Sequence, residues 1–269
     1  MLILRPIAVL GRSTVDVVTF IGGVGNLIYS AALELPRGLI SGRGRRMGWR
    51  NVWAQMVRVG VRAIPIVSLV LFCIGAILAL QMAPILAKFG VTDTVADIIS
   101  IATFRELGPL VAAIVLTGFA GASIAAEMGT MVVSEEIEAM EAHAITPARF
   151  LVLPRIIATT VMMVCLTIIA DLMGLAGGMT VGHFFLDIDP RLYLARSFDI
   201  VMVRDFLTGL VKAGVFGVVI SGLACYLGLG VTGGAQGVGV ATTRTVVLTI
   251  VALIFIDLLF TAVFYYLGW

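Results

Sequence analysis

Five long apolar segments, separated by shorter polar ones, dominate the pattern of this 269-residue chain. They cover residues 63–87, 107–133, 152–182, 206–229 and 245–267. A helix needs roughly 20 apolar residues to cross the hydrocarbon core of a bilayer, so each segment is long enough. The pattern therefore predicts an all-α integral membrane protein with five transmembrane helices. The third segment is longer than one crossing requires, and its Gly174, Gly177 and Gly178 indicate an exit from the membrane, a kink or a tilt.

A short acidic segment, residues 134–147, separates the second and third apolar segments. Ser134 is a favourable N-cap, glutamates follow it in and just after the first turn, and Pro147 closes the segment. The pattern predicts a short soluble helix between two spans. Two interpretations remain open: a handle for another protein, or a linker kept acidic for solubility.

Residues 1–62 form a basic N-terminal segment that precedes the five-span domain at 63–269. This segment carries nine arginines against only Asp16 and Glu34, so its end of the bundle is expected to face the cytoplasm. Five spans would then place the acidic helix in the cytoplasm and the C-terminus outside. The stretch 15–35 is apolar apart from those two acids and is interpreted as an interfacial helix along the inner leaflet. A signal peptide is disfavoured because no small-residue cleavage site follows it.

Composition agrees with a membrane protein, since 60% of residues are hydrophobic, 13% are charged and the mean hydropathy is +1.12. The three cysteines fall inside predicted spans, at spacings that suit neither a disulfide framework nor a metal site. There is no Walker-type glycine loop with a lysine, and the glycine-rich residues 228–239 are predicted to form a flexible turn. We therefore expect no cofactor, no metal and no nucleic-acid partner.

Four charged residues fall inside the predicted spans: Glu127, Asp171, Lys212 and Asp257. An unpaired charge at mid-bilayer costs at least about 2.5 kcal/mol, which indicates either buried pairing or a polar path. Lys212 and Asp257 lie at overlapping depths in consecutive spans, so we predict that they pair. Asp171 is alternatively a solvated residue near the outer surface.

A relay through these charges would make the chain an ion- or proton-coupled secondary transporter. The odd span count and the absence of a visible internal repeat disfavour that alternative. A purely structural membrane anchor is a third possibility, in which the charges serve only for pairing.

The second span contains two rows of small residues at four-residue intervals. The rows are Gly118, Ala122 and Ala126, and Gly121, Ala125 and Gly129. Rows of this kind allow helices to pack closely, so we predict tight contacts along this span.

Several blocks of sequence resemble the MlaE/YrbE family of permeases. They are residues 105–113 (RELGPLVAA), 120–123 (AGAS), 126–129 (AEMG), 140–147 (MEAHAITP) and 241–247 (ATTRTVV), the last followed by Asp257. The resemblance runs in order from about residue 51 to the C-terminus. One position departs from it: Phe119 stands where family members often have an arginine, so no role of that charge can be transferred.

The resemblance implies the permease subunit of an ABC transporter that moves phospholipid between the inner membrane and an outer-side MCE-domain protein. Two permease copies would form a homodimer in the bacterial inner membrane, each with its N-terminus cytoplasmic and its C-terminus periplasmic. The chain itself would not be an enzyme, because ATP would be hydrolysed by a separate cytoplasmic ABC ATPase.

Two sets of residues are then expected to have functional roles. The acidic helix becomes a coupling helix that contacts the ATPase through Glu135, Ile137, Glu138, Met140 and Glu141. The lipid path is expected at the dimer axis, open outward and lined by Ile77, Leu78, Leu80 and Gln81 of the first span, with help from the fifth.

Overall fold

The computed structural model describes the backbone of residues 4–40, 45–91 and 94–268, and the side chains of 14–34, 49–91 and 94–268. These residues form helices and contain no strand. The α-helices are α1 (Leu4–Ile40), α2 (Arg45–Val59), α3 (Ile64–Lys88), α4 (Thr94–Ala102), α5 (Gly108–Leu116), α6 (Ala122–Val133), α7 (Glu136–Ala142), α8 (Leu153–Leu186), α9 (Pro190–Ile200), α10 (Val203–Leu229) and α11 (Gly234–Tyr266). The all-α prediction is confirmed.

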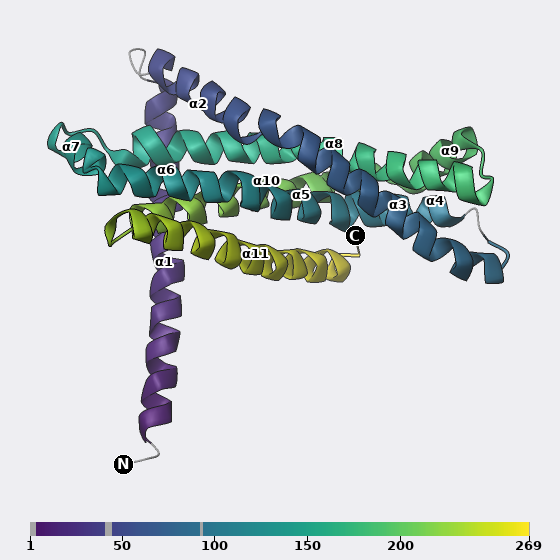
Figure 1. The fold of residues 1–269 in the computed structure, drawn as a ribbon, viewed down its shortest axis with the longest axis horizontal. Helices are drawn as coiled ribbons and strands as arrows, with labels where there is room; N and C mark the ends of the chain where they lie inside the picture. The colour runs from purple at the N-terminus through teal and green to yellow at the C-terminus, as the bar shows by residue number, and fades with distance from the viewer. Residues whose placement is uncertain (1–3, 41–44, 92–93, 269) are drawn as a thin grey trace.

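Five helical runs lie along a common direction and correspond to the predicted spans (Figure 1). They are α3, the run α4–α5–α6, α8, α10 and α11. The second run is longer than predicted, because π-helical turns at Thr103–Leu107 (η2) and Thr117–Gly121 (η3) join its three helices without a break. The last is also longer, since α11 begins at Gly234, inside the stretch predicted to be a flexible turn.

A sixth helix is also long and apolar enough to cross a membrane, namely residues Thr14–Glu34 within α1. The prediction of five spans is thus one fewer than the candidates among the described residues. Figure 1 shows α1 crossing the bundle at a steep angle, near the end that carries α7. That direction favours a helix along the membrane surface over a further span, and the interfacial position stays a prediction.

The helix α8 lies at the centre of the bundle and packs along α3 and α10, while α11 packs on α6 and α10. The buried core consists of alanines and larger aliphatic or aromatic side chains. Its fully buried members include Ala112, Leu116, Met163, Leu166, Phe216 and Ile220. Because small and large residues alternate, the helices can approach closely and still leave a filled interior.

The glycines of α8 mark a close helix crossing, whereas the sequence indicated an exit, a kink or a tilt. A Cβ atom on Gly177 would lie 2.0 Å from the Phe72 carbonyl oxygen of α3. A Cβ atom on Gly75 of α3 would lie equally near the Gly174 oxygen, at 2.0 Å. Since α8 continues to Leu186, Gly177 and the backbone of Gly174 serve the contact between α3 and α8, while Gly178 packs against Tyr193 and Ile99.

Close packing of the second span is confirmed for one of its two rows of small residues. Gly129 faces Val231 and Val238, and a Cβ atom on Gly228 of α10 would lie 3.0 Å from the Ala125 carbonyl oxygen. On the other row, a Cβ atom on Gly118 would meet no atom within 4 Å. Gly118 therefore faces away from the neighbouring helices of this chain, whereas Ala122 and Ala126 of the same row are partly buried.

At the end opposite α7, helix α9 folds back onto the bundle (Figure 1). Its N-cap is Asp189, whose carboxylate accepts the Arg191 N–H at 2.7 Å. The ring of Tyr193 is buried against Gly178 and Gly182 of α8, and this burial raises the pKa of its hydroxyl.

Candidate functional site

A cluster of charges joins three helical runs near the α9 end of the bundle. Lys212 Nζ lies 2.9 Å from Asp257 Oδ1, so the predicted pair is present. Lys212 also donates to Glu106 Oε2 at 2.6 Å and to the Thr261 hydroxyl at 3.0 Å. The Thr261 hydroxyl in turn donates to Glu106 Oε1 at 3.0 Å. With only 1% of its side chain exposed, Lys212 is neutralised by two carboxylates.

The π-helical turn η2 positions the acidic partner that sequence reasoning missed. Arg105 and Glu106 are adjacent in this turn, and both bind α10: Arg105 pairs with Asp205 at 3.5 Å, and Glu106 with Lys212. Gly209 lies between these two contacts, and a Cβ atom there would lie 2.3 Å from the Phe104 carbonyl oxygen. The π turn and the glycine thus allow η2 to lie directly on α10, in keeping with the frequent use of π turns at functional sites.

Asp171 of α8 is buried, with 1% exposure, so the interpretation of a solvated outer-surface residue is wrong. Its carboxylate lies against Gly108, where a Cβ atom would come within 1.7 Å of Asp171 Oδ1. This oxygen has no hydrogen-bond partner in the described part of the chain. Gly108 of the RELGP block therefore leaves room for a buried carboxyl group.

Glu127 lies in a separate cluster, close to the α7 end. Its Oε1 atom is 2.9 Å from Arg58 Nη1 of α2 and 3.1 Å from Arg155 Nη2 of α8. Arg155 is 4% exposed and also donates to the Leu151 carbonyl oxygen at 2.9 Å. Glu127 is therefore paired within the fold, and the two arginines link α2, α6 and α8 next to α7.

The four predicted intramembrane charges do not form one chain of contacts. Glu106 and Glu127 lie on the same helical run, and at about 1.5 Å per residue they are about 30 Å apart. Only Lys212 and Asp257 of the predicted set are in contact. Arg155 could have been found, because it lies inside the predicted third span. Glu106 lies just outside the predicted start of the second.

The acidic helix is present but shorter than predicted. It spans Glu136–Ala142, and its N-cap is Glu135 in the left-handed conformation, with φ 59°. Ser134, the predicted N-cap, instead ends α6, and its hydroxyl donates to Glu136 Oε1 at 3.0 Å. The left-handed residue turns the chain out of α6, so α7 projects beyond the end of the bundle (Figure 1).

The two faces of α7 differ in exposure. Ile137 and Met140 are partly buried and pack against the core of this chain. Glu135, Glu138 and Glu141 are exposed. A partner would therefore meet an acidic surface, with less of Ile137 and Met140 available than the sequence suggested.

The four residues expected to line a lipid path do not share one face of α3. Ile77 and Leu80 are 49% and 48% exposed, and Gln81 is also exposed. Leu78 instead packs with the small apolar cluster of Ala79, Val95, Ile99 and Val181. Phe119, at the position that departs from the family resemblance, is 39% exposed on η3.

These features define a multi-pass helical membrane protein with buried charge clusters and an acidic helix outside the bundle, an architecture suited to a transport permease. The sequence model of the family described as "Permease MlaE" matches residues 52–263. The chain therefore belongs to the MlaE permease family, which confirms the resemblance seen in the sequence.

Curated relatives agree with this assignment. A probable ABC transporter permease protein of Rickettsia felis is 39% identical over 211 residues, covering 78% of this chain and 82% of the relative. A similarly named protein of Synechocystis is 35% identical over 208 residues, 77% of this chain and 79% of the relative. The intermembrane phospholipid transport system permease protein MlaE of Haemophilus influenzae is 28% identical over 268 residues, 99% of this chain and 100% of the relative. The chain is thus a permease of the ABC transporter type.

Proposed function

We propose that this chain moves phospholipid between its own membrane and an MCE-domain protein on the outer side, with ATP hydrolysed by a separate ABC ATPase. The observation that carries the proposal is the similarity over 99% of the chain to a permease named for intermembrane phospholipid transport. Family membership favours this function over an ion-coupled relay. Lys212 is paired with Glu106, and Glu127 is paired with Arg155, so these charges are accounted for without a relay.

The proposal assigns α7 as the coupling helix that contacts the ATPase. Its exposed glutamates offer negative charge outside the bundle, and the half-buried Ile137 and Met140 anchor it to the core. A displacement of α7 would therefore be transmitted directly to α6. The ion pairs of Glu127 with Arg58 and Arg155 would transmit it further, to α2 and α8. This link is what a coupling element requires.

Reversing the charge of α7 is expected to weaken the ATPase complex. Glu138→Lys and Glu141→Lys, alone and together, place positive charge where basic residues of the ATPase are expected, and such like-charge contacts cost several kcal/mol. The double variant should lower ATPase co-purification by about tenfold or more and abolish transport. Quantitative mass spectrometry of the purified complex measures this loss.

The matched control is Asp199→Lys on α9, at the other end of the bundle, which should co-purify the ATPase at the unmodified level. If the double variant of Glu138 and Glu141 retains ATPase binding and transport at that level, α7 is only a linker and the proposal that it couples to the ATPase is wrong.

The proposal also sets the orientation of the chain. The arginines of residues 1–62 would lie at the cytoplasmic surface, and Figure 1 shows α2 and α7 at the same end of the bundle. This agreement supports a cytoplasmic N-terminus, a cytoplasmic α7 and, with five crossings, a periplasmic C-terminus in a bacterial inner membrane.

A homodimer would place the lipid path between two copies, along the outward half of α3 and part of α11. The exposure of Ile77, Leu80 and Gln81 supports this position. Acyl chains require a largely apolar surface, because removing each methylene group from water is favourable by about 0.8 kcal/mol. Exposed apolar residues in the outward half of α11, such as Phe255 and Leu258, would complete it.

Photocrosslinkers at single positions of α3 test the path. At Ile77 and Leu80 we expect phospholipid adducts whose yield changes when ATP hydrolysis is trapped, since the proposed cavity must open and close during the cycle. Leu78 is the matched control, because it is partly buried against the cluster of Ala79, Val95, Ile99 and Val181 and should give fewer adducts. Equal yields at all three positions in every nucleotide state would mean that this face contacts only bulk membrane.

A further inference from the structure

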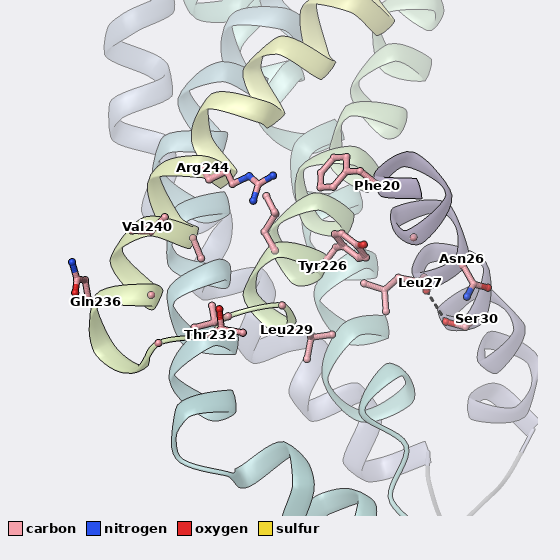
Figure 2. Close-up of a pocket in the computed structure, with 17 residues that line it drawn as sticks. Phe20, Asn26, Leu27, Ser30, Tyr226, Leu229, Thr232, Gln236, Val240 and Arg244 are labelled. Atoms are coloured by element: carbon pink, nitrogen blue, oxygen red, sulfur yellow. Dashed lines mark hydrogen bonds between the residues drawn. The ribbon is translucent and has the colours of Figure 1, made fainter. Parts of the chain in front are cut away.

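A cavity of about 920 Å³ lies between α1, the end of α10 and the start of α11 (Figure 2). It is at the end of the bundle that α1 crosses, whereas the lipid path proposed above lies in the outward half of α3 and α11. The volume is in the range of about 300–1,000 Å³ that small-molecule sites occupy. The close approach of α1 and α10 forms one wall, since a Cβ atom on Gly23 would lie 2.4 Å from the Tyr226 hydroxyl oxygen.

The lining of this cavity has an apolar part and a polar part. Phe20, Leu27, Leu229 and Val240 supply apolar side chains, while Asn26, Ser30, Thr232 and Gln236 supply hydrogen-bonding groups. Arg244 is the charged residue of the lining, and no acidic residue contributes to it. Figure 2 shows the Arg244 guanidinium extending from α11 across the cavity towards Phe20 of α1.

Arg244 forms no ion pair or hydrogen bond with the described residues, unlike the paired cations Lys212, Arg58 and Arg155. An arginine guanidinium binds phosphate through several N–H donors at once. Because the rest of the lining is uncharged, the charge of Arg244 is available to an anion. The polar part of the cavity thus favours an anionic group.

The apolar part of the cavity favours a ligand with hydrocarbon attached to that anion. Helix α1 exposes Val15, Val18, Ile21, Tyr29 and Leu33 on the sides that do not face the bundle. A helix with so much exposed apolar surface requires a lipid environment. With α1 in its predicted interfacial position, the cavity opens where α1 meets the acyl chains and headgroups of one leaflet.

We propose that this cavity binds a glycerophospholipid from the leaflet in which α1 lies. The phosphodiester lies against Arg244, the headgroup meets the hydrogen-bonding residues, and the acyl chains leave past Phe20 and Leu27. This site is separate from the outward path on α3. It does not depend on transport by the chain.

The test uses the full-length protein without ATPase, in vesicles of phosphatidylethanolamine and phosphatidylglycerol. A small diazirine amino acid replaces Val240, which lines the cavity, or Val251, which is exposed about three turns further along the same face of α11. Mass spectrometry then gives the fraction of protein that carries a phospholipid adduct. Each position is compared with and without the change Arg244→Gln.

Arg244→Gln should lower the adduct yield at Val240 by about fivefold or more, because a charge-assisted contact is lost. Yield at Val251 should stay unchanged, and Arg244→Lys, which keeps the charge, should retain most of the yield at Val240. Adding millimolar inorganic phosphate should not displace the lipid.

Three results would overturn the proposal. Equal loss at Val240 and Val251 would mean that Arg244 acts on the fold and not on a local ligand. No loss at Val240 would mean that the adduct comes from bulk lipid. Displacement by inorganic phosphate would mean that the cavity takes a free anion.

Discussion

Replacing Lys212 with methionine is expected to destabilise the protein by at most about 3–5 kcal/mol, because it removes the cation that neutralises the mostly buried Asp257 and the partly exposed Glu106. Asp257 is 13% exposed and would be left beside Glu106 without a counter-charge. Leaving a buried charge unpaired costs more than the ion pair itself contributes. Thermal unfolding of the purified protein in mild detergent measures the change.

The effect should depend on which partner is removed. Asp257→Asn leaves Lys212 bound to Glu106 and Thr261, so it should cost less than Lys212→Met. Combining Glu106→Gln, Lys212→Met and Asp257→Asn removes all three charges and should recover part of the lost stability. Lys88→Met is the matched control, since Lys88 is exposed at the end of α3, and should change stability by no more than about 0.5 kcal/mol.

The three charges would not act as a mutually stabilising cluster if Lys212→Met, Asp257→Asn and the triple variant destabilised the protein equally. That pattern would mean that each residue acts separately and that their contacts contribute little.

Adding a single methyl group where α3 crosses α8 is expected to destabilise the bundle by about 1–3 kcal/mol. In Gly177→Ala and Gly75→Ala the new Cβ atom would overlap a backbone oxygen of the other helix at 2.0 Å, and backbone cannot rotate away as a side chain can. Chemical unfolding in detergent and the yield of folded protein both report this cost.

Gly239→Ala on α11 is the control for the glycine variants. No atom lies within 4 Å of a Cβ atom at Gly239, and alanine favours a helix over glycine by about 0.5–1 kcal/mol, so this variant should be neutral or slightly more stable. If Gly177→Ala and Gly75→Ala unfold at the same denaturant concentration as Gly239→Ala, the crossing is looser than the structure indicates.

Hydropathy predicted the existence and order of the membrane helices well, because length and apolar composition decide whether a segment can span a bilayer. The ends of the helices were less predictable. Glu106 lies where the apolar average falls, so the sequence did not reveal that a π turn continues the helix past it. The start of α7 was misplaced, because a left-handed Glu135, and not the favourable cap Ser134, precedes its first residue.

The side-chain contacts of the site required the structure. Lys212 and Asp257 could be paired from their depths alone, but Glu106 and Thr261 depend on how far each helix is rotated about its axis. The same is true of Leu78, which is adjacent to the exposed Ile77 in sequence yet is partly buried against a neighbouring apolar cluster. The glycines of α8 suggested a bend, since sequence alone does not tell a kink from a close crossing.

We infer that this chain is the membrane subunit of an ATP-driven phospholipid transporter. Mild purification of the chain from its native membrane, followed by mass spectrometry of the proteins and lipids that accompany it, tests this claim most directly. We expect two copies of the chain with an ATPase that carries a Walker motif, an MCE-domain protein and bound phospholipid. A chain that purifies without any ATPase, and whose reconstituted transport follows an ion gradient instead of ATP, would contradict this inference.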